Sequence, residues 1–261
     1  MVDSINRFNT RVENYAKFRP RYPPIIIDLL KSYCGLTEAS RVADVGSGTG
    51  ILSEMLLRNG NTVFGVEPNA QMRSSAEKLL GNYPQFESID GAAEATTLES
   101  HSIDIVTAAQ AFHWFDHTRT RVEFARILKP KGWVALIWNE RRLDSNPFLR
   151  AYEQLLLQYG TDYQKVRHEN VTKQIADFFA PHAFRLESIE NIQTFDFERL
   201  LGRVLSSSYT PEPDHPGFEP MIASLREVFE KHQQRGTIAF EYDTRVYSGQ
   251  LNDLIKVGAI S

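Results

Sequence analysis

The first half of the chain alternates between two patterns of apolar residues. Short continuous apolar runs are typical of strands that are covered on both faces, and apolar residues three and four apart indicate amphipathic helices. The runs predict strands at 42–45, 62–67, 86–89, 103–109 and 133–139. The spacings predict helices at 4–19, from 25 to about 35, and at 51–58, 69–80 and 118–128, with a turn at 129–132. Such alternation favours a parallel sheet with right-handed crossovers.

Past Asn139 the alternation ends. Helices are predicted at 146–159, 172–179, 197–206 and 217–234, and strands at 184–195 and 237–247. Residues 237–247 alternate in the manner of an antiparallel or edge strand. The linker-like segment 210–220 is too short and too late to separate an independent domain. We therefore expect a single domain over residues 1–261.

Composition narrows the class of protein. The chain has 261 residues, 42% of them hydrophobic and 24% charged, with a formal net charge of −4. The absence of Lys/Arg runs argues against a nucleic-acid partner and favours a small-molecule one. A single cysteine, Cys34, excludes an internal disulfide framework and fits a reducing compartment. With neither an N-terminal apolar leader nor a run of about eighteen apolar residues, we expect a cytoplasmic protein without membrane partners.

The stretch RVADVGSGTG at 41–50 contains the first predicted strand and a glycine-rich turn that leads into a helix. Its glycines Gly46, Gly48 and Gly50 allow positive φ and close approach of a ligand, and the next helix presents unpaired N–H groups. The stretch predicts a site for a polar or anionic ligand. Ile51 stands where the dinucleotide fingerprint needs its third glycine, and the Lys-Ser/Thr ending of a P-loop is absent.

An acidic residue, Glu67, ends the second predicted strand, seventeen residues beyond Gly50. A carboxylate at this position can accept hydrogen bonds from both hydroxyls of a ribose. The glycine turn and Glu67 together indicate a nucleoside-containing cofactor.

From residue 8 to about 140 the chain resembles the class I S-adenosylmethionine-dependent methyltransferases, in the small-molecule branch that includes trans-aconitate methyltransferase-like proteins. The segments that carry the resemblance are YAKFRPRYP, VADVGSGTG, VFGVEPNAQM, GAAEATTL, IDIVTAAQAFHWFD and ILKPKGWVALI. The resemblance implies a Rossmann-like α/β fold with a mostly parallel seven-stranded sheet flanked by helices. It further implies an antiparallel last strand, N-terminal lid helices (1–35), a cofactor-binding core (36–139) and a C-terminal half with a helical substrate-side insertion (140–261).

The same resemblance implies how the cofactor is held. The glycine turn would pass beneath the methionine part, Glu67 would hold the ribose, and the loop after the third strand would edge the adenine. The cofactor-binding residues expected on this basis are Asp44, Gly46, Ser47, Gly48, Glu67, Pro68, Met72, Ala93, Glu94, Gln110 and Ala111. Many relatives have Asp where this chain has Ala92, which leaves the contact to the adenine amino group open.

Substrate-side candidates lie before residue 23 and after the fourth strand. The residues singled out as substrate-binding are Tyr15, Arg19, Trp114, Arg141 and Tyr209, with Arg142, Arg203 and Ser208 as further candidates. Arginine suits an anionic acceptor because it can form two parallel hydrogen bonds with a carboxylate. His113 is the catalytic candidate, with a substrate contact or a purely structural role as alternatives. No metal site is expected, since His113 and His117 have no third ligand of suitable spacing.

These observations lead to one principal hypothesis and two alternatives. The principal one is S-adenosylmethionine-dependent methyl transfer to a small molecule, at a carboxylate or hydroxyl oxygen, by a monomer or weak homodimer. The alternatives are an NAD(P)-dependent oxidoreductase on a similar sheet and a catalytically silent cofactor-binding protein.

Overall fold

A single sheet of seven strands organises the part of the chain that the computed structural model describes, residues 18–163 and 171–251. Its strand order is β3-β2-β1-β4-β5-β7-β6. The strands are β1 (Arg41–Val45), β2 (Thr62–Val66), β3 (Phe86–Ile89), β4 (Ile103–Ala109), β5 (Leu128–Arg141), β6 (Phe184–Phe195) and β7 (Ile238–Gly249). Strands β1 to β5 pair in parallel, and β7 pairs antiparallel with both β5 and β6. The predicted mostly parallel seven-stranded sheet with an antiparallel last strand is confirmed.

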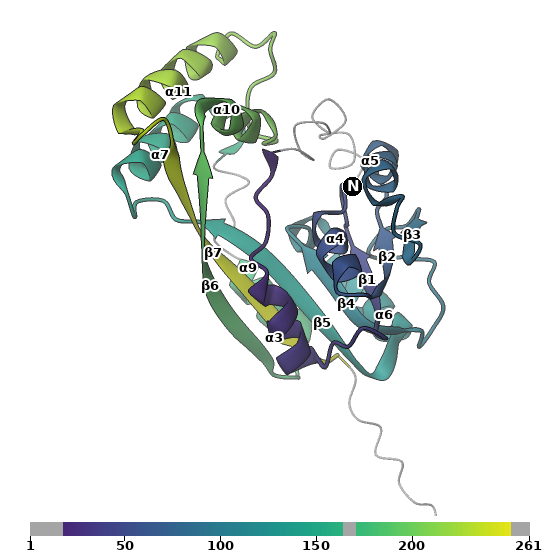
Figure 1. Cartoon of the computed structure of the whole chain (residues 1–261). Helices are drawn as coiled ribbons and strands as arrows, with labels where there is room; N and C mark the ends of the chain where they lie inside the picture. The colour runs from purple at the N-terminus through teal and green to yellow at the C-terminus, as the bar shows by residue number, and fades with distance from the viewer. Residues whose placement is uncertain (1–17, 164–170, 252–261) are drawn as a thin grey trace, which may run out of the picture.

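Helices flank this sheet (Figure 1). They are α3 (Ile25–Cys34), α4 (Ile51–Arg58), α5 (Ala70–Leu80), η1 (Phe112–Trp114), α6 (His117–Ile127), α7 (Pro147–Tyr159), α9 (Val171–Phe179), α10 (Phe197–Leu205) and α11 (Phe218–His232). The predicted helix at 4–19 lies almost wholly outside the described residues. No helix in the described ranges is both long and apolar enough to cross a membrane.

One boundary differs by more than two residues from the prediction made from sequence. The expected turn at 129–132 lies inside β5, which begins at Leu128. Its pairing with β4 shifts register there, from Ile103 opposite Leu128 to Ile105 opposite Trp133. The extra residues on β5 are accommodated as an irregularity of the strand, because pairing with β4 resumes on both sides of them.

Two hydrophobic cores cover the two faces of the sheet. Alternate residues of β5 show the division, because Leu136 belongs to the core beneath α6 and α9 whereas Ile137 belongs to the core beneath α3 and α4. The strand order reverses at β1, between β2 and β4. Ligands of open α/β sheets bind at such a reversal, outside the carboxyl ends of the strands.

A third core forms a C-terminal lobe, which consists of α7, α10, α11 and the adjoining ends of β6 and β7. Its fully buried members include Leu149, Tyr152, Leu225 and Phe240. In Figure 1 the lobe lies at the upper left, at one end of the paired strands β6 and β7, and α4 and α5 lie on the right. The lobe and the glycine-turn half therefore have separate hydrophobic centres.

An extended segment at residues 18–24, here called the strap, runs between these two parts. The carbonyl oxygen of Arg21 accepts hydrogen bonds from the side-chain amides of Asn139, Asn191 and Gln193, at 3.4, 3.1 and 2.9 Å. At one end Arg19 Nη2 donates to the carbonyl of Ser206 in the lobe at 3.0 Å. At the other end Tyr22 is buried in the core beneath α3 and α4. The strap is the purple segment that rises from α3 in Figure 1.

Candidate cofactor and acceptor sites

The glycine turn sits at the reversal of strand order, and all three of its glycines have positive φ. A Cβ on Gly46 would lie 2.5 Å from Cβ of Ala111, so the loop after β4 packs directly on this glycine. The N–H groups of Gly46 and Ser47 donate to the carbonyl of Val66, at 2.8 and 3.2 Å. The turn therefore joins the carboxyl ends of β1, β2 and β4 with little room for any side chain.

Glu67 follows β2, and its carboxylate is held by two backbone N–H groups. Gly48 N–H donates to Oε2 at 3.0 Å, and Asn69 N–H donates to Oε1 at 2.9 Å. Burial raises the pKa of Glu67, and the two backbone hydrogen bonds oppose that rise. Each carboxylate oxygen has two lone pairs, so both oxygens keep acceptor capacity for ligand hydroxyls. The side chain is thus fixed in place with acceptor capacity to spare.

Asp44 is more deeply buried, with 1% of its surface exposed. Ser53 Oγ of α4 donates to its Oδ2 at 2.7 Å, and Thr107 Oγ1 of β4 donates to its Oδ1 at 3.0 Å. Burial raises its pKa to about 6, against the lowering effect of these hydroxyls. Asp44 therefore ties β1 to both neighbouring elements at the base of the glycine turn.

A hollow opens above Asp44 and the turn. It is lined by Tyr22, Asp44, Gly46, Ser47, Thr49, Ile51, Leu52 and Ala109. Thr49 Oγ1 is buried there without a hydrogen-bond partner. Oε1 of Gln110, which directly follows the lining residue Ala109, is also buried without one. Gln110 has a φ of 54°, and its Nε2 donates to the carbonyl of Asn139 at 3.3 Å. Buried polar atoms are normally hydrogen-bonded, so these two oxygens indicate a polar ligand. The Thr49 hydroxyl can donate to a carboxylate and Oε1 of Gln110 can accept from an ammonium group, which fits the amino-acid end of S-adenosylmethionine.

The residues expected near the ribose and adenine lie beyond β2 and β3. Pro68 and Met72 stand at the start of α5, whose N-cap, Asn69, accepts hydrogen bonds from two backbone N–H groups of that helix. Ala93 is buried. Glu94 Oε1 accepts a hydrogen bond at 2.7 Å from the backbone N–H of Asp116, next to α6. The loops after β3 and β4 are thereby connected.

His113 and Trp114 lie on η1, directly after the Ala111 that packs on Gly46. Their rings are tilted by 45° with centroids 4.6 Å apart, and both are partly exposed. Phe112, between Ala111 and His113, is fully buried and stacks on His117 at 4.2 Å. The buried Phe112 fixes the short helix, so that its next two side chains stand beside the glycine-turn end of the sheet.

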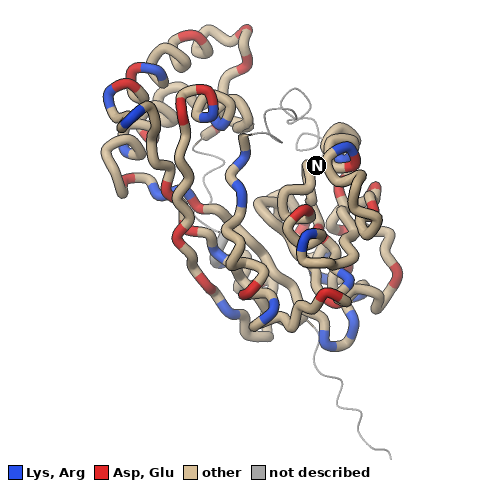
Figure 2. Tube along the Cα trace, in the orientation of Figure 1, with Lys and Arg blue, Asp and Glu red and all other residues tan. Residues whose placement is uncertain are grey.

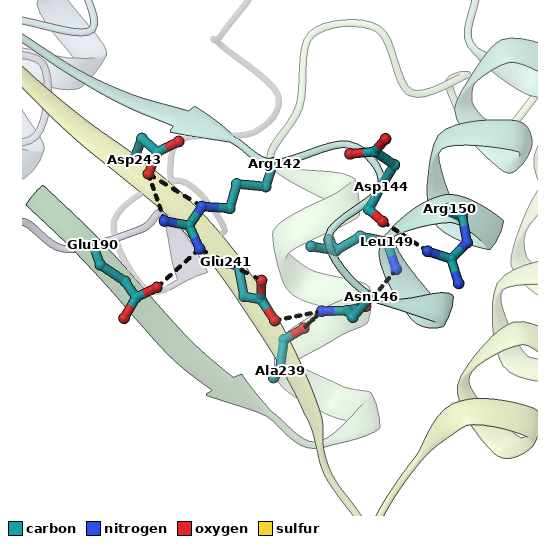
Figure 3. A network of polar contacts seen from close by, with 9 residues as sticks. All are labelled: Arg142, Asp144, Asn146, Leu149, Arg150, Glu190, Ala239, Glu241 and Asp243. Atoms are coloured by element: carbon teal, nitrogen blue, oxygen red, sulfur yellow. Dashed lines mark hydrogen bonds and ion pairs between the residues drawn. The ribbon is translucent and has the colours of Figure 1, made fainter. Parts of the chain in front are cut away.

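The substrate-side arginines fall into different environments. Arg142 is on the surface of the β5–β7 region, where it pairs with Asp243 at 2.7 Å and Glu190 at 2.9 Å (Figure 3). The neighbouring Asn146 bonds Glu241 at 2.8 Å, which closes an acid-rich network around the start of α7. Arg142 is therefore fully occupied by surface acids.

Arg141 points the other way, into the C-terminal lobe. Its Nη2 pairs with Glu153 and donates to the hydroxyl of Tyr163 at 2.7 Å, and its guanidinium lies over the ring of Tyr152 at 5.0 Å. Tyr209 contacts Tyr163 edge to face, with centroids 5.0 Å apart. Arg141 and Tyr209 are thus brought into one cluster, whereas Tyr15 lies outside the described residues.

Arg203 of α10 is buried in the same lobe, and its Nη1 donates to Ser207 Oγ at 2.7 Å. We call the set Arg141, Tyr152, Glu153, Tyr163, Arg203, Tyr209 and Tyr242 the arginine–tyrosine cluster. Ser208, beside Tyr209, is partly exposed.

Several residues of the two candidate sites could not be recognised as functional from the sequence. Tyr152 and Glu153 lie in the amphipathic pattern of α7, and Tyr242 lies in the alternation of β7, as ordinary core positions would. Thr49 belongs to the glycine motif and could have been noticed there. The row formed by Asn139, Asn191 and Thr244 links three strands through hydrogen bonds of 2.6 to 3.3 Å, and is visible only once the strands are paired.

Comparisons with known proteins agree with this geometry. Residues 43–136 match the family model described as a methyltransferase domain. An uncharacterized methyltransferase-like protein of Schizosaccharomyces pombe is 30% identical over 257 residues, which cover 94% of this chain and 96% of the relative. An uncharacterized methyltransferase of Mycobacterium tuberculosis is 40% identical over 134 residues, about half of each chain.

Solved structures support the same fold. A putative type II methyltransferase from Anaeromyxobacter dehalogenans superimposes with a TM-score of 0.64 at 21% identity, over 90% of this chain and 99% of the other. The glycine turn, the acid after β2 and these relatives together place the chain in the class I methyltransferase family, whose members take the methyl group from S-adenosylmethionine.

Proposed function

We propose that this methyltransferase acts on a small molecule, at a carboxylate or hydroxyl oxygen. The observation that carries the proposal is the burial of the arginine–tyrosine cluster. The side chains of Arg141 and Glu153 are each only 10% exposed, so the charged groups on the acceptor side lie inside the lobe. A nucleic acid would instead need basic residues on an open surface, and basic and acidic positions are interspersed along both halves of the chain (Figure 2).

The residues around the glycine turn are suited to holding the cofactor. We assign the ribose hydroxyls to Glu67 and the amino-acid end to Thr49 and Gln110, with Asp44 positioning the turn beneath them. When bound, S-adenosylmethionine supplies an electrophilic methyl group on a sulfonium sulfur. The loops after β2, β3 and β4, including Pro68, Ala93 and Glu94, are assigned to the rest of the nucleoside.

The strap is suited to closing the space between cofactor and acceptor. Tyr22 lines the hollow at the glycine turn, and Arg19, three residues earlier, contacts the lobe. Three residues of extended chain span at most about 10 Å, and this short separation along the strap supports the proposal that one small molecule reaches both sites. Aromatic side chains here, with Trp114 on the opposite loop, would exclude water from the sulfonium.

The reaction then depends mainly on positioning. A carboxylate acceptor is already ionised and needs no base, whereas a hydroxyl acceptor benefits from one, and His113 is the candidate for that role. Holding the acceptor in line with the methyl group in a dry pocket supplies the principal rate enhancement. We further propose that the chain acts as a monomer or weak homodimer and that Tyr15 belongs to the lid.

Calorimetry and a transfer assay on the full chain test the proposal. S-adenosylhomocysteine should bind, and NAD and NADP should not. Labelled methyl groups from S-adenosylmethionine should appear on at least one member of a panel of small acids and alcohols, and not on short DNA or RNA. Binding without transfer to any acceptor would instead favour the catalytically silent cofactor-binding protein.

A further inference from the structure

Among the residues that the structure describes, Arg203 is a buried cation without an acidic partner. Only 8% of its surface is exposed, and it forms no ion pair with any acid in the described ranges. Its Nη1 donates to Ser207 Oγ at 2.7 Å, but its buried Nε has no hydrogen-bond partner. Burying a charge is costly unless the charge is paired, so a lone buried guanidinium requires an explanation.

Two other arginines of this region, Arg141 and Arg142, are each paired with acidic residues, as is expected of arginines with a structural role. Arg141 is buried to a similar degree and is paired with Glu153. Arg142 is on the surface and pairs with Asp243 and Glu190. Arg203 differs from both, because the described groups that act on it are hydroxyls, those of Ser207 and of three tyrosines.

Those surroundings are phenolic. Burial lowers the pKa of Arg203, but the phenolic groups of Tyr242, Tyr209 and Tyr152 outweigh burial and raise it. Burial in turn raises the pKa of Tyr209, yet Arg203 and Arg141 bring it below its ordinary value. This part of the lobe therefore carries a positive charge at Arg203 that no described acid pairs with, together with hydroxyl groups able to donate hydrogen bonds.

We propose that Arg203 and the tyrosines around it bind an oxyanion of the acceptor, a carboxylate or a phosphate. The free Nε and the neighbouring guanidinium nitrogens form a fork that suits two parallel hydrogen bonds to such a group. The anion would give Arg203 a counter-charge, as Glu153 does for Arg141. This inference rests on the proposed function, since it assigns one end of the acceptor of the same reaction.

The cluster is connected to the cofactor side through β5 and the strap. Asn139 and Arg141 are two residues apart on β5, so their side chains share one face of the strand. Asn139 donates to the strap carbonyl of Arg21, and its own carbonyl accepts from Gln110. An acceptor anchored at Arg203 can thus extend along this face toward the hollow at the glycine turn.

Binding of paired probes to the full chain, saturated with S-adenosylhomocysteine, tests the inference. The probes are acetate, succinate and benzoate, each matched with its neutral amide, and inorganic phosphate. At least one acid should bind at least about tenfold more tightly than its amide, as expected for a charge-assisted pair. Tighter binding of phosphate than of any carboxylate would assign the site to a phosphate-bearing acceptor.

Single-residue variants test whether Arg203 causes the preference for an oxyanion. Arg203→Met should weaken the preferred oxyanion about tenfold or more, Arg203→Lys should weaken it less, and the surface control Arg142→Met should leave it unchanged. Urea unfolding of each variant separates packing from binding. If Arg203 only packs, Arg203→Met will shift the unfolding midpoint and keep the preference for acid over amide.

Two results would overturn the inference. One is that, in the wild type, every acid binds no better than its amide and phosphate does not bind, a comparison that does not depend on whether any variant folds. The other is that the preference survives in folded Arg203→Met. Failure of S-adenosylhomocysteine to bind would instead refute the proposed function, so the two failures are distinguishable.

Discussion

The backbone N–H of Gly48 donates to the carboxylate of Glu67 at 3.0 Å, which joins the glycine turn to the carboxyl end of β2. One side chain therefore both shapes the turn and faces the predicted ribose position. This pair gives one expectation for the cofactor site, and the contact between Gly46 and Ala111 gives a second.

Replacing Glu67 with Ala should weaken binding of S-adenosylhomocysteine by about 1–3 kcal/mol, the scale for losing hydrogen bonds to a charged partner. Isothermal titration calorimetry measures the change. The exposed Glu99→Ala variant is the matched control and should bind as the wild type does. A folded Glu67→Ala protein with unaltered affinity would remove Glu67 from the ribose role.

Replacing Gly46 with Ala should abolish cofactor binding and destabilise the protein. Gly46 has a φ of 69°, and the new Cβ would collide with Ala111 at 2.5 Å. Gly35 is a matched control, because its φ is 68° and nothing lies within 4 Å of an added Cβ. Gly35→Ala should cost only the left-handed strain, roughly 1–2 kcal/mol, and should keep cofactor affinity. Equal urea midpoints for the two variants would show that the contact with Ala111 is loose.

The burial of Asp44 predicts a pH dependence of stability. Because burial raises its folded pKa from 3.8 to about 6, the folded state takes up a proton that the unfolded state does not. The contribution of Asp44 to the free energy of unfolding should therefore rise as the pH falls from 7 to 4, by up to about 3 kcal/mol. It is lost again as the pH rises through 6.

Urea unfolding of the wild type and Asp44→Asn at pH 7.5, 6 and 4.5, without cofactor, isolates this contribution. Other groups titrate in both proteins, so only the difference in the free energy of unfolding is informative. That difference should move in favour of the wild type at low pH. A difference that is constant over this range would show that Asp44 stays ionised in the folded protein.

Breaking the pair between Glu153 and Arg141 should be strongly destabilising. Glu153→Gln keeps the shape of the side chain but leaves Arg141 buried without a counter-charge, which costs about 3–5 kcal/mol. The surface pair gives the contrast, since Glu190→Gln beside Arg142 should cost less than about 1 kcal/mol. Urea denaturation measures both, and similar midpoints would mean that Arg141 finds another acceptor.

The cofactor half could be predicted largely from local sequence. Strand, glycine turn and helix follow one another between Arg41 and Arg58, so the local sequence contains both the two elements and the residues that separate them. Glu67 was recognisable because a parallel sheet brings its strand end beside that turn. The resemblance to class I methyltransferases added the antiparallel last strand, which the pattern of 237–247 only suggested.

The acceptor half could not be predicted in the same way. A helical spacing shows that Glu153 and Arg203 lie near buried faces, but it does not show which charge meets which. Arg141 and Arg142 are adjacent in sequence, and only strand pairing turns one inward and the other toward Asp243. The start of β5 at Leu128 was missed for a related reason, because a Lys-Pro-Lys-Gly turn signal carries no information about the partner strand.

The paired strands β6 and β7 run on past the end of β5, from the pair Asn191–Tyr242 to the pair Phe195–Ile238 in the lobe. Because the lobe has a hydrophobic centre of its own, substitutions within it need not disturb the packing around the glycine turn. The lobe helices α7, α10 and α11 can therefore change in evolution while residues 41–139 stay the same. One and the same cofactor-binding half can in this way be combined with lobes that accept different methyl acceptors.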